Sequence, residues 1–307
     1  MSIKRVEIEG FLVFKGELVI DFSPGINVII GDNGTGKTTL IKAIYSNKEV
    51  IQAHEKVCNP SGIQNYDVRT TDGKTFKIYV NYDVDDKTNY IYIPEKDILE
   101  HAKGLLPFIK QKQTSFTQVY EDILVVAQDV PTKEQSKTQK SIGQKIAEII
   151  DGYVEWVPSD GMYYTIKTDG SRIPFIHEAS GFKKLGLLGL LLSCGQLDSS
   201  TTLFWDEPEN SLNPELVPKL VDILLELAQS GVQIFIASHN YALVRYFDVR
   251  RNKDVPVLFL NLTKDDGKIV CYSSPEYLKL PNNILEETGG NLFEAVIADA
   301  MEVQLSE

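Results

Sequence analysis

The sequence predicts an α/β fold with a mixed, mostly parallel central sheet, helices on its faces and an inserted α+β lobe. Three apolar segments predict it. Residues 25–31 form an apolar run bounded by glycines and followed by a helical pattern, which is typical of a strand covered on both faces. Residues 202–205 and 232–237 are two further apolar runs, separated by a helix of about 16 residues. A strand, a helix and a strand in this order form a crossover between parallel strands.

The composition is that of an ordinary globular chain. Its 307 residues are 43% apolar and 24% charged, with a net charge of −12. A chain of this length can bury a full core, as one large domain with an insertion or as two domains. The negative charge argues against a protein that coats nucleic acid or anionic membranes, because that requires a basic surface.

The cysteines and the apolar runs indicate in which cellular compartment the protein is expected and whether it spans a membrane. Cys58, Cys194 and Cys271 are too scattered for a disulfide framework or a zinc site, and nothing at the N-terminus resembles a signal peptide. We therefore expect a reducing cytoplasm. The longest apolar run, residues 185–193, is about half of the ~20 residues that a membrane span requires, so we expect no membrane partner.

The first part of the predicted core is residues 1–46. Residues 3–12 and 17–22 are short β-rich runs, and we predict a strand for each. From Thr38 to about Ser46 the apolar residues recur at helical spacing, so a helix follows the glycine-bounded strand.

The character of the chain changes between residues 47 and 175, which we interpret as the inserted lobe. Polar strands alternate with helices rich in Gln and Lys, and the segment ends in a hairpin. The predicted strands are residues 76–84, 90–93, 153–158 and 162–167, with a turn at 159–161, and the predicted helices cover about 97–127 and 133–150.

The second part of the predicted core is residues 176–307. Its crossover helix has a clear start, because Asn213 is a good N-cap, Pro214 suits the first helical position and Glu215 faces the positive end of the helix dipole. Residues 281–307 hold six acids and no Lys or Arg, which is typical of a solvated helix face or of a tail that docks a partner. A strand pair is predicted at residues 257–260 and 268–272 around a turn at 265–267, and a last helix over roughly 292–303.

A phosphate-binding loop follows the first apolar strand. Residues 31–38 read Gly-Asp-Asn-Gly-Thr-Gly-Lys-Thr and fit the pattern G-x-x-x-x-G-K-[ST], with a buried strand before it and a helix after it. Glycines let consecutive backbone N–H groups turn toward one anion, and the helix adds its positive end. Lys37 is expected to reach the β- and γ-phosphates and Thr38 to bind Mg²⁺; the alternative is an ordinary glycine turn. The predicted nucleotide contacts are Asn33, Gly34, Thr35, Gly36, Lys37, Thr38 and Thr39.

Two acids and a histidine follow the other two apolar strands. In an open parallel sheet the ligand lies beyond the carboxyl ends of the strands, where Asp206, Glu207 and His239 emerge. We expect Asp206 to hold Mg²⁺, Glu207 to polarise the attacking water as the catalytic base, and His239 to contact the γ-phosphate. The alternatives are a surface turn before Pro208 and a structural histidine. No role is assigned to His54, His101 or His177.

Together with Ala179-Ser180-Gly181 and Asn210-Ser-Leu-Asn213, these motifs resemble the ABC-type ATPase head shared by SMC, RecF and overcoming-lysogenization-defect (OLD) proteins. The likeness is strongest to the compact AAA-family ATPases of bacterial anti-phage and toxin systems, and it covers residues 1–46 and 175–245. It implies ATP and Mg²⁺ as cofactors, a head-to-tail homodimer or higher homo-oligomer, and His239 as the switch histidine. It also implies that Ser180 and Gly181 contact the γ-phosphate bound by a second protomer, and that residues 210–213 are the D-loop.

The chain departs from this pattern at three places. Phe182 and Lys183 stand where the family has its second signature glycine and the residue after it, so Ser180 could instead cap a helix that begins near Phe182. The nearest candidate for the glutamine loop is residues 92–95. Coiled-coil arms, a zinc hook and the acidic cluster of a fused nuclease are not found in the sequence.

We therefore predict a Mg²⁺-dependent ATPase whose ATP-controlled dimer or scaffold regulates a separate effector, a nuclease or toxin, in anti-phage defence. The alternatives are a RecF-like DNA-repair ATPase that clamps DNA and an ATP-gated scaffold with negligible hydrolysis. Lysines gather at two places in the inserted segment, which is typical of a solvated face but leaves nucleic acid open as a partner. They are Lys103, Lys110 and Lys112, and then Lys133, Lys137, Lys140 and Lys145.

Overall fold

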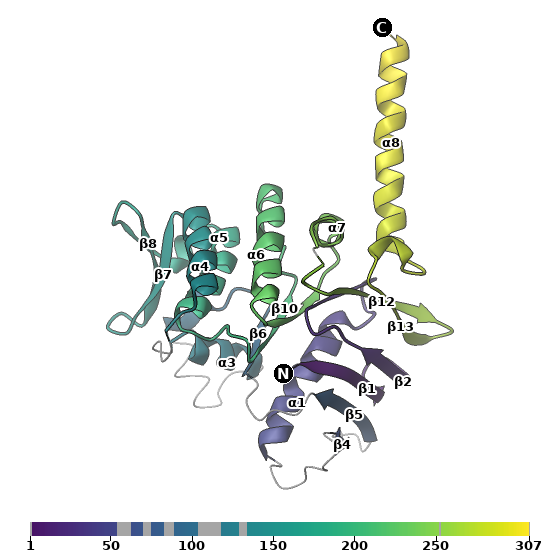
Figure 1. Ribbon diagram of the computed structural model, residues 1–307, viewed down its shortest axis with the longest axis horizontal. Coiled ribbons are helices and arrows are strands. Elements are labelled where there is room, and N and C mark those ends of the chain that lie inside the picture. The colour runs from purple at the N-terminus through teal and green to yellow at the C-terminus, as the bar shows by residue number, and fades with distance from the viewer. Residues whose placement is uncertain are drawn as a thin grey trace.

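A six-stranded sheet forms the centre of the molecule (Figure 1). The computed structural model describes residues 2–53, 63–69, 75–82, 89–103, 118–128, 134–251 and 253–306. The strand order is β13-β12-β3-β11-β10-β6, in which the five strands from β12 to β6 are parallel and β13 pairs antiparallel at one edge. The predicted α/β class with a mixed, mostly parallel sheet is confirmed. The strands are β3 (Ile26–Gly31), β6 (Asn89–Ile93), β10 (Thr201–Asp206), β11 (Gln233–Ala237), β12 (Val257–Asp265) and β13 (Lys268–Ser274).

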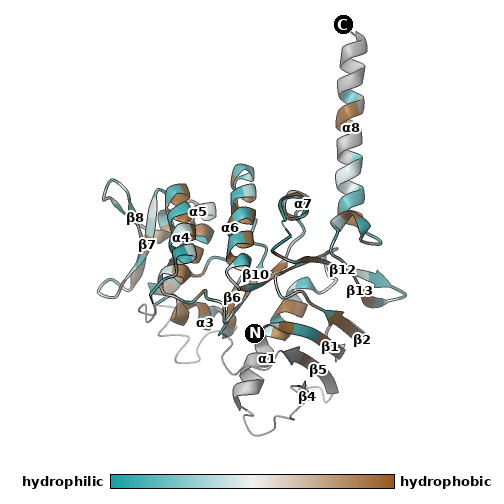
Figure 2. Ribbon diagram, in the orientation of Figure 1, coloured by the Kyte–Doolittle hydropathy of each residue, from teal (hydrophilic) through white to brown (hydrophobic). Residues whose placement is uncertain are grey.

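The central strands are buried on both faces, which explains their continuous apolar sequences. Every residue of β10 and β11 is buried. Because side chains alternate along a strand, Ile29, Phe204 and Phe235 pack on the side of helix α1 (Lys37–Ala53). Val28 and Trp205 face the opposite core, beneath the helices drawn above the sheet in Figure 1. Figure 2 shows the apolar colour concentrated on the sheet and on the helix surfaces turned toward it.

A second, antiparallel sheet contains the N-terminal strands. Its order is β2-β1-β5-β4, so the two N-terminal strands lie beside two strands of the following segment. In Figure 1 this sheet lies beside α1, on the side of the central sheet away from α6 (Val217–Gln229). The strands are β1 (Ile3–Phe11), β2 (Phe14–Asp21), β4 (Ile63–Arg69) and β5 (Thr75–Tyr82).

The segment from 47 to 175 is distributed over three sheets. β5 and β4 belong to the N-terminal sheet and β6 forms an edge of the central sheet, while β7, β8 and β9 form a small sheet of their own. This differs from a single separate lobe, and the reason is that the unpaired edges of β1 and β10 are satisfied by β5 and β6. The predicted hairpin with its turn at residues 159–161 is confirmed. The small sheet comprises β7 (Gly152–Val157), β8 (Met162–Lys167) and β9 (Arg172–Pro174).

Between β6 and β7, the described helices of the segment from 47 to 175 lie within the predicted ranges of about 97–127 and 133–150. Ser136 and Gln139 form a capping box at the start of α4, where each side chain bonds to the other's backbone N–H. Between the 3-10 turn η1 and helix α3, residues 104–117 lie outside the described part of the chain, and so do Lys110, Lys112 and Lys133. The bounds are η1 (Leu99–His101), α3 (Gln118–Val126) and α4 (Lys137–Ile150).

The crossover between β10 and β11 is confirmed. Asn213 accepts a hydrogen bond from the backbone N–H of Glu215 and starts the 3-10 turn η3 (Pro214–Leu216), which leads into α6 (Val217–Gln229). The last helix, α8 (Ile284–Ser306), begins earlier than predicted and projects away from the sheets (Figure 1). The described residues contain no helix with the length and apolar character of a membrane span. The other elements are η2 (Phe175–His177), α5 (Ser180–Ser193), α7 (Tyr241–Arg250) and η4 (Tyr277–Lys279).

Alanine substitutions at two helix glycines are expected to have opposite effects on the free energy of unfolding. A Cβ added at Gly143 in α4 would have no atom within 4 Å, whereas one at Gly186 in α5 would lie 2.6 Å from Cγ2 of Val154. We expect Gly143→Ala to raise the free energy of unfolding by about 0.5–1 kcal/mol, because alanine is the better helix former. Gly186→Ala should lower it by about 1–3 kcal/mol through overpacking. Urea denaturation of both variants checks this, and equal midpoints would contradict it.

Candidate functional site

The predicted functional residues meet at one edge of the central sheet. β3, β11 and β10 are adjacent and parallel, so their carboxyl ends share that edge. The glycine-rich loop follows β3. Asp206 is the last residue of β10 and Glu207 is the next residue in the chain, while Ser238 and His239 follow β11. Thr38, at the end of the loop pattern, hydrogen-bonds to Asp206, and the Glu207 carboxylate contacts the His239 ring.

The glycine-rich loop has a backbone that requires its glycines. Gly31, Gly34 and Gly36 have φ angles of +142°, +79° and +94°. A Cβ on Gly36 would lie 2.6 Å from Cγ2 of Val13, so the loop also packs closely against the turn between β1 and β2. A Cβ on Gly34 would meet nothing within 4 Å, and Asn33 and Gly34 are exposed. The loop is therefore packed on one side and open on the other.

Lys37 is the first residue of α1 and its ammonium lies inside the loop. Its Nζ donates hydrogen bonds to the carbonyl oxygens of Gly31, at 2.7 Å, and Asp32, at 3.1 Å. Burial lowers the pKa of Lys37, while the negative charges of nearby acids, Glu207 first among them, act in the opposite direction. The next residues of the same helix turn, Thr38 and Thr39, are half-buried.

Thr38 and Asp206 are in direct contact. The Thr38 hydroxyl donates to Oδ1 of Asp206 at 3.0 Å, and the Tyr92 hydroxyl donates to Oδ2 at 3.2 Å. Burial raises the pKa of Asp206, and the two hydrogen bonds oppose that rise. Burial also raises the pKa of Tyr92, with the charge of Asp206 as the next cause, so its hydroxyl stays protonated.

The pair formed by Thr38 and Asp206 fits a magnesium ion that is shared with a nucleotide. Mg²⁺ prefers oxygen ligands and commonly binds through one or two carboxylates together with substrate phosphates and water. In the part of the chain that the structure describes, no group of three or more His, Cys, Asp or Glu side chains could hold a metal ion by itself. Thr38 and Asp206 offer two oxygen ligands, and the other ligands of such an ion would be water or phosphate oxygens.

The Glu207 carboxylate and the His239 ring are in contact beside this pair. Oε1 of Glu207 lies 2.9 Å from Nδ1 of His239, and the histidine side chain is 56% exposed. The backbone of Glu207 is held on both sides, because its N–H donates to the Ala237 carbonyl at 2.9 Å and its carbonyl accepts from Lys184 Nζ at 2.7 Å. These bonds stabilise a left-handed conformation with φ of +48°. A carboxylate so fixed can accept a proton from a water molecule held nearby.

Two further residues at this edge were not predicted from the sequence. Lys184 is a buried lysine within the apolar helix α5, and burial lowers its pKa. Glu209 is buried, its pKa is raised by burial, and its Oε1 accepts from the Ser238 hydroxyl at 2.5 Å. The Ser238 oxygen in turn accepts from the backbone N–H of Asn240 at 3.0 Å, which holds the turn that carries His239. Lys184 could have been recognised from the sequence, because a lysine is unusual in an otherwise apolar run. No pattern in the sequence distinguishes Glu209.

The predicted signature residues lie at the start of α5. The interpretation of Ser180 as a helix cap is wrong, because α5 begins at Ser180 and its N-cap is Ala179, which makes no side-chain cap bond. Ser180 is exposed, and among the described residues neither it nor Gly181 hydrogen-bonds to the glycine-rich loop. Gly181 instead packs on the predicted D-loop, since an added Cβ would lie 3.3 Å from the Ser211 carbonyl oxygen.

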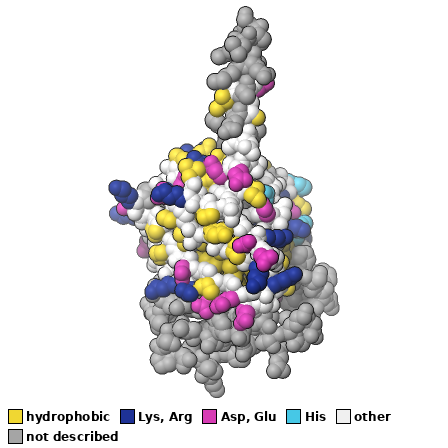
Figure 3. Space-filling view, turned by 90° about the vertical axis from the view of Figure 1, so that its right-hand side faces the viewer, with side chains coloured by type: hydrophobic (Ala, Val, Ile, Leu, Met, Phe, Trp, Pro, Cys, Tyr) yellow, Lys and Arg dark blue, Asp and Glu magenta, His cyan; other side chains and the backbone are white. Residues whose placement is uncertain are grey.

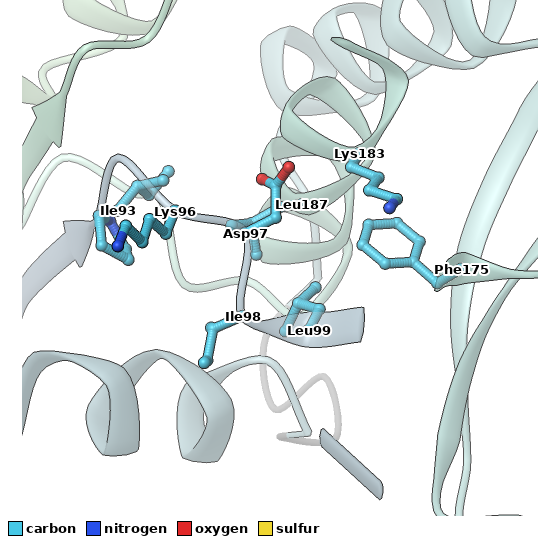
Figure 4. Close-up of a pocket in the computed structure, with 9 residues that line it drawn as sticks. Ile93, Lys96, Asp97, Ile98, Leu99, Phe175, Lys183 and Leu187 are labelled. Atoms are coloured by element: carbon cyan, nitrogen blue, oxygen red, sulfur yellow. The ribbon is translucent and has the colours of Figure 1, made fainter. Parts of the chain in front are cut away.

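The segment after β6 connects these elements. The Asn210 amide donates to Oε1 of Glu95 at 3.3 Å, which joins the predicted D-loop to the candidate glutamine loop. Lys183 contacts Glu100 and donates to the Ile176 carbonyl at 3.1 Å. Figure 4 shows the small pocket between this segment and α5, with Asp97 and Lys183 among its lining residues. The start of α5 is thereby fastened to the segment that follows β6.

Two protein-family models match the chain. The one described as "AAA domain, putative AbiEii toxin, Type IV TA system" matches residues 105–245, and one described as "AAA domain" matches residues 5–156. The structural maintenance of chromosomes protein 3 homolog of Plasmodium falciparum is 32% identical over 127 residues, 39% of this chain and 10% of that protein. The DNA replication and repair protein RecF of Limosilactobacillus fermentum is 41% identical over 58 residues, 15% of this chain and 16% of that protein. The chain thus spans only a small part of these relatives.

Solved structures show the same fold. The SMC head bound to the C-winged helix domain of ScpA matches with a TM-score of 0.54 and 14% identity, over 89% of this chain and 98% of that one. The Smc head of Pyrococcus furiosus, with an extended coiled coil and bound to the C-terminal domain of ScpA, matches with a TM-score of 0.52 and 13% identity, over 93% and 99%. At these identities the likeness is one of fold.

Proposed function

We propose that the chain is an ABC-type ATPase head of the SMC and RecF class. In this proposal it binds ATP with Mg²⁺, hydrolyses the ATP, and uses it to control a dimer or scaffold that regulates a separate effector. One observation carries the catalytic part. The contact of Thr38 with Asp206 and the contact of Glu207 with His239 both lie at the carboxyl edge of the strands that carry the glycine-rich loop.

Nucleotide binding is assigned to the loop and the first turn of α1. Backbone N–H groups of the loop would bind the phosphates from its exposed side at residues 33 and 34. Lys37 would exchange its two carbonyl partners for phosphate oxygens. Thr38 and Asp206 would hold Mg²⁺, and the ion would neutralise charge on the β- and γ-phosphates when bound. Thr35 and Thr39 flank this site and complete the predicted contacts.

Hydrolysis is assigned to Glu207 and His239. The Glu207 carboxylate would accept a hydrogen bond from the attacking water and draw its proton away, as a general base does. His239 keeps that carboxylate in one orientation through Nδ1, and its exposed ring would contact the γ-phosphate through the other nitrogen. ATP plus water would give ADP and phosphate.

A histidine pair tests the catalytic assignment. We expect His239→Ala to lower kcat for ATP hydrolysis by about 100-fold, at the lower end of general-base effects, because Glu207 loses its positioning partner but stays in place. His177→Ala is the matched control, because His177 is exposed in η2. Steady-state phosphate release measures both variants, and equal rates for the two would contradict the assignment.

The proposed dimer is head-to-tail, with residues on one protomer completing the ATP site of the other. Ser180 and the D-loop residues Asn210, Ser211 and Asn213 are exposed, so they are available to a second copy. Gly181 is buried and packs against Ser211, so the exposed Ser180 lies close to the exposed D-loop residues. A higher homo-oligomer would use the same surface in each pair of protomers.

The effector is proposed to be a nuclease or toxin of an anti-phage system. The family description that names an AbiEii toxin and a Type IV TA system supports this setting. Purification of the tagged chain from its native host, with ATP trapped and without ATP, would identify a protein that binds one state only. A chain that purifies alone in both states would oppose the proposal.

DNA is the second candidate partner, because RecF and SMC proteins are among the relatives. Lys103, Lys137 and Lys140 are exposed, whereas Lys145 is paired with Glu226. On the face in Figure 3, acidic and basic side chains are interspersed among the described residues. A DNA clamp would bind DNA in an ATP-dependent way, and its affinity for DNA would fall steeply with rising salt concentration.

Single-turnover phosphate release separates the effector-regulating ATPase and the DNA clamp from a scaffold with negligible hydrolysis.

A further inference from the structure

We propose that Tyr92 is a positioning residue for the metal site: its hydroxyl holds one oxygen of Asp206 so that the other faces Thr38 and the ion that the nucleotide brings. The inference rests on the proposed function and deepens it. Tyr92 touches neither nucleotide nor metal in this assignment, and it acts only through the Asp206 carboxylate.

The strand register places Tyr92 where it can do this. β6 pairs parallel with β10, and Tyr92 is the partner of Phe204. Side chains two residues apart on a strand share a face, so Phe204 and Asp206 lie on the same face as Tyr92. The phenol ring therefore extends along that face toward the end of β10, and its hydroxyl reaches Oδ2 of Asp206 at 3.2 Å.

The ring of Tyr92 is immobilised. Tyr92 is 2% exposed, and its ring centroid lies 5.3 Å from that of Tyr45 on α1. The Tyr45 ring in turn lies 5.9 Å from Phe204. A ring enclosed in this way has no room to swing, so its hydroxyl is a fixed hydrogen-bond donor.

The two oxygens of Asp206 are divided between two donors. Oδ1 accepts from Thr38 at 3.0 Å, and Oδ2 accepts from Tyr92. Thr38 must release Oδ1 when both ligands turn to a metal, but the bond to Oδ2 can persist. The plane of the carboxylate is then set before the ion arrives, as outer-shell partners do at metal sites. Without the hydroxyl, a buried carboxylate oxygen would lose its partner and the group would be free to rotate.

Tyr92→Phe tests this with Tyr45→Phe as its matched control. Both variants remove one phenolic hydroxyl from neighbouring rings, and the Tyr45 hydroxyl also donates to a carboxylate, that of Asp122. The full chain is titrated with a fluorescent ATP analogue at a series of Mg²⁺ concentrations and in EDTA. Thermal melting of each variant reports on the fold.

In Tyr92→Phe, we expect the Mg²⁺ concentration that half-restores tight nucleotide binding to rise about 10-fold. This is the low end for outer-shell partners, because 3.2 Å is long for a bond between two oxygens. Affinity in EDTA should stay within about twofold of wild type, and Tyr45→Phe should leave the Mg²⁺ dependence within the same range. If Tyr92→Phe only disturbed the fold, nucleotide affinity would fall both with Mg²⁺ and in EDTA.

Two results would overturn the inference while the proposed function stands: a Mg²⁺ dependence in Tyr92→Phe equal to that of wild type, or a shift of the same size in Tyr45→Phe. A wild-type chain that binds no ATP analogue at any Mg²⁺ concentration would instead overturn the proposed function, and this inference with it.

Discussion

Glu207→Gln is expected to lower ATP turnover by about 1,000-fold and to trap ATP-bound dimers. The amide keeps the size and the hydrogen-bonding position of the carboxylate, but it cannot accept the proton of the attacking water. The loop, Lys37 and Thr38 are untouched, so the nucleotide stays bound. Single-turnover phosphate release measures the chemical step, and size-exclusion chromatography with ATP measures the dimer.

The control for this prediction is Glu155→Gln. Glu155 is exposed on β7, in the small sheet, and it carries the same chemical change away from the site. Its turnover should equal that of wild type. Unchanged hydrolysis in Glu207→Gln would reject the mechanism, and a variant that loses hydrolysis but elutes as a monomer with ATP would reject the ATP-controlled dimer alone.

Lys37→Ala is expected to weaken ATP binding by about 100-fold. The ammonium is the positive side chain inside the loop, and charge-assisted hydrogen bonds to phosphate are worth about 1.5–3 kcal/mol each, which is roughly tenfold or more per bond. Its low exposure of 8% means that water does not replace it at the same place. Calorimetric titration with ATP and Mg²⁺ measures the affinity.

Lys140→Ala is the matched control for Lys37→Ala, because Lys140 is exposed on α4 and its side chain bears the same charge. Thermal melting of both variants guards against a loss of fold, since the Gly31 and Asp32 carbonyls lose their donor in Lys37→Ala. An affinity in Lys37→Ala within a few-fold of wild type, with an intact fold, would contradict the assignment of the loop.

Much of the core could be predicted because its signals are local. The strand before the glycine-rich loop and the two strands that end in Asp206 and before Ser238 are continuous apolar runs, as strands covered on both faces must be. Parallel pairing then brings their carboxyl ends to one edge. The residues Thr38, Asp206, Glu207 and His239 could therefore be expected together, although their roles remain predictions.

Other features depend on contacts that no local pattern encodes. β6 and β5 each join a different sheet, because the strands they pair with, β10 and β1, are far away in the chain. The exposed N-terminus of α5 is capped by no side chain, although Ser180 is of a type that favours caps. Glu209 lies close to the predicted acids in sequence, but its function in the fold is to hold Ser238, which a sequence of charges does not reveal.

The sequence by itself determined the glycine-rich loop, the central strands and the edge at which the acids emerge. These follow from short-range rules: which residues tolerate a left-handed turn, and which runs can be buried on both faces. The tertiary structure alone decided which side chains support that edge, namely Lys184 on the Glu207 carbonyl, Glu209 on Ser238 and Tyr92 on Asp206. Hydrogen bonds between residues distant in the chain exist only once the sheets and helices have packed.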